Sequence, residues 1–159
     1  MILVLLGTQD KQFGRLLEAI QREIDNRVIK GKVVVQAGCT KFKSNDMEIF
    51  DWIPIDDFNE LIKKAELIIT HGGVGSIVEA LKNNKKVIVA PRLKKYNEHV
   101  NDHQLQIIDA FADMGYILPL KDFNKLGDLI EKTRGFKPKK FESNTHNMIK
   151  LIENYIDKV

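Results

Sequence analysis

Residues 67–84 read LIITHGGVGSIVEALKNN, and this stretch decides the fold. Its opening is short, mostly apolar and β-branched, which is typical of a strand buried on both faces. Three glycines then fall within four positions, and residues 77–84 have the apolar spacing of an amphipathic helix. A buried strand that turns directly into a helix is the repeating unit of α/β proteins.

The same alternation extends over most of the chain. Six short apolar runs predict strands at residues 2–6, 33–37, 49–53, 67–70, 87–90 and 116–118. Between them lie amphipathic stretches with apolar residues three and four positions apart, such as Phe13, Leu16, Leu17, Ile20 and Ile24. Continuous apolar strands alternating with helices indicate a parallel sheet that is covered on both faces. We therefore expect an α/β, doubly wound, Rossmann-like fold of about six strands.

After the last predicted strand, residues 123–133 are expected to form a further helix. Residues 134–140 read RGFKPKK, a basic loop broken by glycine and proline. A closing C-terminal helix is predicted to start near Asn144, with an apolar side formed by Met148, Ile149, Ile152, Tyr155, Ile156 and Val159. Such a helix either packs back on the domain or docks a second chain.

Length and composition narrow the class of protein. The chain has 159 residues, of which 43% are hydrophobic and 30% charged, and we expect one globular domain over residues 1–159. A net charge of +3 is too mild to indicate a nucleic-acid binder. Cys39 is the only cysteine, which excludes an intramolecular disulfide and favours a reducing, cytoplasmic setting. The apolar run at residues 2–6 is too short for a signal peptide or a spanning helix, so any membrane attachment would be peripheral.

Ligands of open α/β sheets bind at the carboxyl ends of the strands, so the glycine-rich turn after the fourth predicted strand is the first candidate site. Glycines let the backbone approach a ligand closely, and the free N–H groups of a helix start favour a phosphate or diphosphate. Ser76 could add a hydroxyl donor, and Glu79 could accept hydrogen bonds from a ribose. The alternative is an ordinary tight turn with a serine cap and Glu79 as an acid that complements the helix dipole.

Two common nucleotide motifs are absent. A dinucleotide fingerprint would follow the first strand, where the sequence reads Gly7-Thr8-Gln9-Asp10-Lys11, and no acid for a ribose ends the second strand. The turn at Gly72 to Ser76 also lacks the Gly-Lys-Ser/Thr ending of a P-loop. The sequence thus disfavours NAD, FAD, kinase and NTPase functions.

The loop after the fifth predicted strand, residues 91–104, is long and polar. Its end carries side chains that could donate to and accept from the hydroxyls of a sugar: Asn101, Asp102, His103 and Gln104. His99 and His103 stand four apart, but no third ligand with a recognisable spacing accompanies them, so no metal is expected. The alternative here is a helix cap surrounded by solvated polar residues.

These motifs resemble glycosyltransferase family 28. The similarity is carried by residues 65–80 (AELIITHGGVGSIVEA), 86–91 (KVIVAP) and 101–104 (NDHQ), together with 4–8 (VLLGT) near the start. The chain resembles the C-terminal domain of that family. Within the family, it is most similar to the small catalytic subunits of split transferases. These include the cytosolic subunit that adds the second N-acetylglucosamine to dolichol-linked sugar, and bacterial counterparts in capsule and exopolysaccharide assembly.

The resemblance implies one half of a GT-B enzyme, which binds a UDP-sugar without a cofactor or metal. By motif, the donor diphosphate would contact Gly7, Thr8, Gly73, Val74, Gly75 and Ser76. Glu79 would hold the ribose, Trp52 and Ile53 would lie at the uracil, and Asn101, Asp102, His103 and Gln104 would contact the donor sugar. Arg92 could assist at the sugar or diphosphate. Trp52 could equally be a half-buried core aromatic.

An inverting transfer also needs a base for the acceptor hydroxyl. His71 is a candidate, but the resemblance favours a base supplied by a partner. That partner is expected to be a membrane-associated subunit that binds a polyprenyl-diphosphate-linked sugar and holds this chain at the cytoplasmic membrane face. The hexose transferred from the UDP-sugar is expected to be GlcNAc, Gal or GlcA. The rival interpretation is a non-catalytic nucleotide-sugar-binding or enhancer subunit. A UDP-sugar epimerase is disfavoured, because it needs two such domains.

Overall fold

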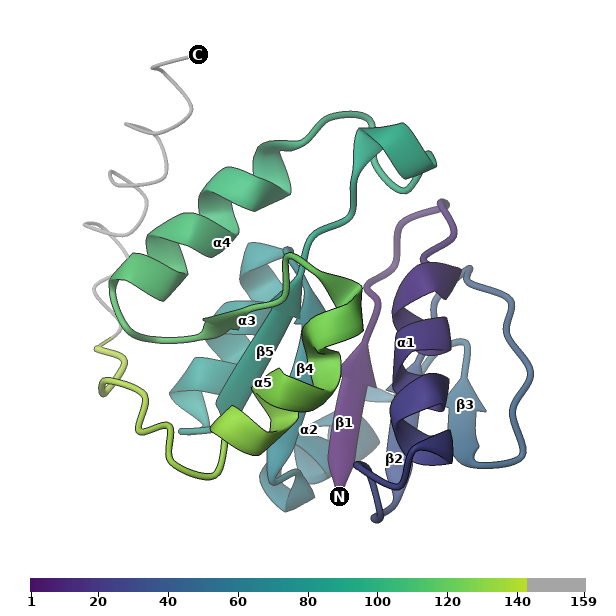
Figure 1. Cartoon of the computed structure of the whole chain (residues 1–159), viewed down its shortest axis with the longest axis horizontal. Helices are drawn as coiled ribbons and strands as arrows, with labels where there is room; N and C mark the ends of the chain where they lie inside the picture. The colour runs from purple at the N-terminus through teal and green to yellow at the C-terminus, as the bar shows by residue number, and fades with distance from the viewer. Residues whose placement is uncertain (143–159) are drawn as a thin grey trace.

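The computed structural model describes residues 1–142, which form a six-stranded sheet with helices on both faces (Figure 1). The strands are β1 (Ile2–Leu5), β2 (Val33–Gln36), β3 (Met47–Phe50), β4 (Leu67–His71), β5 (Lys86–Ala90) and β6 (Leu118–Pro119). Their order is β3-β2-β1-β4-β5-β6, and each neighbouring pair is parallel. The predicted doubly wound fold of six parallel strands is confirmed.

The central strands are buried on both faces, because successive side chains of a strand point to opposite sides of the sheet. In and just after β1, Val4 and Leu6 belong to one core cluster, whereas Leu3 and Leu5 belong to the other. This double burial is why the strands are continuous apolar runs in the sequence rather than alternating ones.

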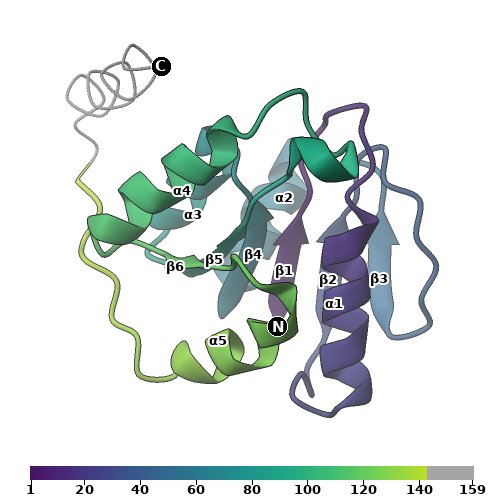
Figure 2. The ribbon, with the colours of Figure 1, turned by 45° about the horizontal axis from the view of Figure 1, so that its top comes forward.

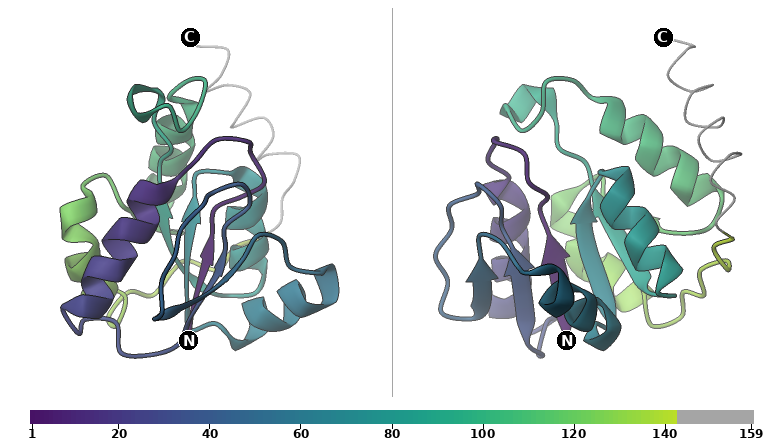
Figure 3. Two further views of the ribbon diagram at one scale, coloured as in Figure 1. Left: turned by 90° about the vertical axis from the view of Figure 1, so that its right-hand side faces the viewer. Right: turned by 180° about the vertical axis from the view of Figure 1, so that it is seen from behind.

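Two helices cover one face and three cover the other (Figure 3). The first face carries α1 (Gly14–Asp25) and α5 (Leu126–Lys132), and the second carries α2 (Ile55–Lys64), α3 (Val74–Lys82) and α4 (His103–Asp113). Two short 3-10 turns, η1 (Lys94–Tyr96) and η2 (Phe123–Lys125), precede α4 and α5. No helix within residues 1–142 is long and apolar enough to cross a membrane.

Several predicted boundaries shift. The third strand was expected at residues 49–53, but β3 ends at Phe50, because it pairs with β2 and the last partner there is Gln36. The sixth was expected at residues 116–118, but β6 begins at Leu118, since the Tyr116 ring packs against Phe111 and Phe141 instead. Residues 123–133 form η2 and α5 rather than one helix. The predicted closing helix near Asn144 lies outside the described residues.

The strand order reverses between β1 and β4, which makes the loops after these two strands the topological switch point of the sheet. Both strands run in the same direction, so their carboxyl ends meet at one edge. This edge lies at the top of Figure 1, where the loops after β1 and β5 rise above the sheet. The loop after β1 contains Gly7, and the loop after β4 contains the predicted glycine turn.

Candidate functional site

The imidazole of His71 lies between the two glycine loops. A Cβ atom built on Gly7 would lie 2.6 Å from His71 Cε1, and one built on Gly73 would lie 2.3 Å from His71 Nε2. Gly7 also has φ +76°, a conformation that L side chains rarely adopt. The loops after β1 and β4 therefore approach one another through a histidine that only glycines could flank so closely.

His71 is neutral near pH 7. Its Nδ1 lies 3.3 Å from the carbonyl oxygen of Leu5, and since a carbonyl only accepts, this contact places the proton on Nδ1. Burial first, and then the positive charge of Arg92, lower the pKa of His71 from 6.5 to about 4. A base with so low a pKa is poorly matched to proton abstraction at neutral pH, which disfavours His71 as the general base.

Helix α3 begins three residues earlier than the predicted start at Ile77, so the glycine turn is the helix N-terminus itself. Gly73 is the N-cap, and Val74, Gly75 and Ser76 are the first three helical residues. No side chain caps this end, and no acidic residue lies in the first turn. The first N–H groups of a helix have no partner within it, so this end offers free donors and the positive end of the helix dipole.

Gln104 connects the glycine turn to the loop after β5. Its Oε1 accepts hydrogen bonds from the backbone N–H of Gly72 at 3.1 Å and of Arg92 at 3.0 Å. Gln104 is 5% exposed, so these two N–H groups would otherwise be buried without a partner. The side-chain amide nitrogen of Gln104 remains as the group that could meet a ligand.

Arg92 was expected to face the sugar or the diphosphate, but it lies in the interior of the protein. Its side chain is fully buried and packs over the Phe13 ring at 4.9 Å. The guanidinium donates to four backbone carbonyls, those of Leu6, Lys11, Gln12 and Glu98. A planar fork of donors suits this arrangement, and it fixes the loop after β1 against the loop after β5. We correct its expected role: Arg92 positions the site and does not face a sugar.

Sequence reasoning missed further contacts that hold the loop after β5 against the loop after β1 and the start of α1. Arg15 forms a bidentate ion pair with Glu98 at 2.9 and 2.7 Å, and its guanidinium stacks over the Phe123 ring at 3.8 Å. Two side-chain contacts span the same gap, Gln9 to His99 at 3.1 Å and Lys11 to Asn97 at 3.3 Å. These pairs are 83 to 90 residues apart, and nothing in the local sequence signals them.

Gly38 is a further element of the site that sequence reasoning passed over. It follows β2 with φ +57°, and a Cβ atom there would lie 2.2 Å from the carbonyl oxygen of Gly7. The signal was present, since a glycine directly follows the first and second predicted strands and another follows the fourth after one residue. Gly38 allows the loop after β2 to pack against the Gly7 loop.

The other expected sugar contacts lie at the start of α4. Asp102 is its N-cap residue and accepts from the Lys94 N–H at 2.8 Å, and Asn101 accepts from the His103 N–H at 3.2 Å. Asp102 is exposed, and Asn101 and His103 are half-buried. The polar end of the loop is thus ordered by its own backbone and still presents side chains to solvent.

Trp52 and Ile53 follow β3, two strands away from β1 in the sheet. Ile53 is buried, whereas Trp52 is 67% exposed, so Trp52 is not a core aromatic. Both residues line a groove of about 320 Å³ that also includes Phe50 and Pro54. The groove runs along β2, β3 and α2, because its lining also includes Lys32, Glu48 and Lys64, and no residue of the glycine turn lines it.

Glu79 lies in the second turn of α3 and is half-buried. Its carboxylate accepts a hydrogen bond from Asn83 Nδ2 at 3.1 Å, which leaves further acceptor capacity. Thr8 is exposed beside Gly7. Within residues 1–142, no group of three or more His, Cys, Asp or Glu side chains is arranged to hold a metal ion.

The fold is shared with solved glycosyltransferase structures. The NMR structure of ALG13 superimposes with a TM-score of 0.59 over 95% of this chain and 94% of that one, at 18% identity. The glycosyltransferase SnogD from Streptomyces nogalater gives 0.54, with 86% of this chain and 39% of that one covered, at 18% identity. MurG of Acinetobacter baumannii gives 0.51, with 95% and 49% covered, at 17% identity. The domain has the Rossmann-like architecture of one half of a GT-B enzyme.

The sequence assigns the family. The model described as the glycosyltransferase family 28 C-terminal domain matches residues 1–158, and the chain belongs to that family. Curated relatives are named UDP-N-acetylglucosamine transferase subunit ALG13: one from Candida albicans is 35% identical over 51% of this chain, and one from Saccharomyces cerevisiae is 38% identical over 33%. The matches span 26% and 24% of those relatives. None of these names supports the expected link to capsule or exopolysaccharide assembly.

Proposed function

We propose that this chain is the donor-binding, catalytic subunit of an inverting UDP-sugar-dependent glycosyltransferase. The observation that carries the proposal is the uncapped start of α3 at the switch point of the sheet, directly opposite Gly7. Such a helix start suits a diphosphate, because several N–H donors and the dipole point to one place. Family membership supports a glycosyl donor over other diphosphates.

The same geometry suits the chemistry of transfer. When UDP leaves, negative charge develops on the diphosphate, and donors that are already in position stabilise this charge as it forms. In our proposal the N–H groups of Gly73, Val74, Gly75 and Ser76, with the Gly7 and Thr8 loop, perform this function without a divalent cation. Arg92 and Gln104 keep the surrounding loops in position.

We assign the rest of the donor to neighbouring residues. Glu79 would accept hydrogen bonds from the ribose, and the exposed Trp52 with Ile53 would meet the uracil. Asn101, Asp102, His103 and the free amide of Gln104 would contact the sugar. The names of the relatives favour N-acetylglucosamine among the hexoses considered.

A partner subunit completes the proposed enzyme. The curated relatives are named as subunits, and the structures of SnogD and MurG match this chain over less than half of their own length. We propose that a membrane-associated partner binds the lipid-linked acceptor, holds this chain at the membrane and supplies the base, because the lowered pKa of His71 makes that residue a weak candidate.

Calorimetry with UDP in the presence of a chelator tests the site. Wild type should bind, and Glu79→Ala should lose binding. Glu131→Ala, which removes an exposed carboxylate on α5, should bind like wild type. Unchanged binding by Glu79→Ala would reject the ribose assignment.

A transfer assay tests the proposed activity. The chain is co-expressed with the product of the neighbouring gene, and a panel of UDP-sugars is tested for transfer to a lipid-linked acceptor. Transfer by this chain alone would contradict the need for a partner.

A further inference from the structure

One short segment that begins at the end of α5 is rich in cations. Residues 132–140 contain Lys132, Arg134, Lys137, Lys139 and Lys140 and no acidic residue, which gives the segment a charge of +5. The whole chain has +3, so all other residues together sum to −2. We call residues 132–140 the basic strap.

The basic strap is held against the body of the domain at several points. Phe136 packs on the core beneath α1 and α5, and the Phe141 ring, just beyond the strap, meets the Tyr116 ring edge-on at 5.5 Å. The Lys139 N–H donates to the Gly115 carbonyl at 3.1 Å. Figure 2 shows the chain after α5 running along the outside of the sheet, past its β6 edge.

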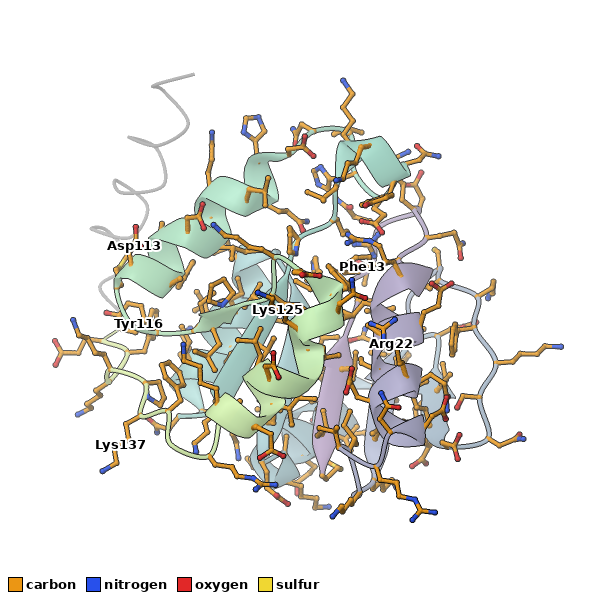
Figure 4. All side chains as sticks on the ribbon, in the orientation of Figure 1. Phe13, Arg22, Asp113, Tyr116, Lys125 and Lys137 are labelled. Atoms are coloured by element: carbon orange, nitrogen blue, oxygen red, sulfur yellow. The ribbon has the colours of Figure 1, made fainter. Side chains whose placement is uncertain are left out.

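These contacts leave the charged ends of the lysine and arginine side chains exposed to solvent. All five cationic side chains are exposed, and Figure 4 shows Lys137 projecting away from the domain. Within residues 1–142, Arg134 pairs with Glu131 at 3.0 Å, and the four lysines of the strap form no ion pair. Exposed cations without a pairing acid in the described part of the chain indicate a surface that attracts anions.

A recess beside the strap adds to this surface. It has a volume of about 220 Å³ and is lined by Leu81, Asn84, Lys85, Pro138, Lys139, Lys140 and Phe141. Three lysines and no acid line it. Lys85 already donates to the Lys63 and Ala65 carbonyls, so its position is fixed, and its charge remains. The acids close in sequence to the strap and to its contact Gly115 are Asp113, Asp128, Glu131 and Glu142, fewer than the six cations of the strap and Lys85 taken together.

The basic strap lies at the opposite end of the sheet from the candidate donor site. Residues 81–85 precede β5, and residues 115 and 116 precede β6, so the recess belongs to the amino ends of these strands. The glycine turn is at the carboxyl end of β4. An anionic surface bound at the strap would leave the donor site open.

We infer that the basic strap docks this chain directly on an anionic lipid bilayer, independently of any partner subunit and of the proposed donor site. Clustered lysines and arginines bind acidic headgroups, and each strengthens binding about fivefold. A bilayer fits better than a folded acidic protein, because the strap offers charge spread along an extended segment, whereas Phe136 and the following Phe141 are partly buried against the core and offer little apolar surface to a protein partner.

Co-sedimentation of the full chain with vesicles tests this inference. Phosphatidylcholine vesicles with about 30% phosphatidylserine should sediment the protein, and pure phosphatidylcholine should not. The triple variant Lys137→Gln, Lys139→Gln, Lys140→Gln should bind the acidic vesicles about a hundredfold more weakly. Its matched control is Lys30→Gln, Lys41→Gln, Lys43→Gln, which removes the same charge from exposed positions before β2 and β3 and should change binding less than about threefold.

Three results would overturn the inference. One is equal sedimentation with and without the acidic lipid, and a second is an equal loss in both triple variants, which would indicate general charge attraction. The third is unchanged vesicle binding in the strap variant. If that variant instead lost binding to an acidic protein, the strap would be a protein-docking surface and not a lipid-docking one. All substituted side chains are exposed, so unfolding midpoints should match wild type and exclude misfolding.

Discussion

The side-chain oxygen of Gln104 lies 3.1 Å from the backbone nitrogen of Gly72, although 32 residues separate the two in the chain. The same oxygen accepts from the Arg92 N–H. One buried amide therefore sets the distance between the glycine turn and the loop after β5. In the proposed enzyme, this distance determines how the diphosphate and the sugar are held relative to each other.

Substitution of Gln104 should separate its structural role from its ligand role. Gln104→Leu leaves two buried N–H groups without acceptors and should lower the free energy of unfolding by about 3 kcal/mol. Gln104→Glu keeps the acceptor and should retain most of that stability and the affinity for UDP. It loses the amide donor, so affinity for a UDP-sugar should fall. Denaturant unfolding and calorimetry measure the two effects, and equal losses of stability in both variants would contradict the role of the oxygen.

The lowered pKa of His71 predicts a dependence of stability on pH. The group is neutral in the fold with a pKa of about 4 and has a pKa of 6.5 when unfolded, so its contribution is complete above pH 6.5 and is lost as the pH falls toward 4. From pH 7 to pH 5 the loss should be about 2 kcal/mol. His71→Gln should remove this part of the dependence in urea titrations at several pH values, and an identical slope in the variant would refute it.

The two glycines at the start of α3 provide a matched pair. Gly73→Ala places a Cβ 2.3 Å from His71 Nε2, whereas a Cβ at Gly75 would meet nothing within 4 Å. We expect Gly73→Ala to lower the free energy of unfolding by about 2 kcal/mol. Gly75→Ala should be neutral or stabilising by up to about 1 kcal/mol, since alanine favours the helix. Thermal unfolding compares them, and similar midpoints would show that His71 does not constrain the turn.

Arg92 should not tolerate lysine. A single ammonium group cannot reach all the carbonyls that the guanidinium contacts, so Arg92→Lys should cost about 2 kcal/mol of stability. Arg134→Lys is the control, because this side chain is exposed, and it should stay within about 0.5 kcal/mol of wild type. If Arg92→Lys unfolds like that control, the guanidinium does not fix the loops.

Much of the fold could be predicted from local sequence, since strands buried on both faces and amphipathic helices leave clear periodicities. Ends of elements were less accurate. Helix α3 begins at Val74 rather than Ile77, because glycines with low helix propensity can still occupy a first turn where the preceding strand sets the direction of the chain.

The site was only partly accessible to the same reasoning. Gly73 was identified from the turn after the fourth predicted strand, Gln104 from the end of the polar loop after the fifth, and Gly7 from the family resemblance; the structure brings them together around His71 and Gly72. Arg92 was expected to assist at the diphosphate or the sugar, because it lies in the polar loop after the fifth predicted strand. Its burial depends on carbonyls that come from a loop some 80 residues earlier, and no local pattern encodes such a contact.

The central claim is that a UDP diphosphate binds at the start of α3. The most direct test is amide chemical-shift mapping by NMR with UDP and, separately, with uridine, both in the presence of a chelator. UDP should produce its largest shifts at Gly73, Val74, Gly75 and Ser76, with smaller ones at Gly7, and uridine should leave these amides unchanged. Equal shifts with uridine, or UDP shifts confined to other parts of the chain, would contradict the account.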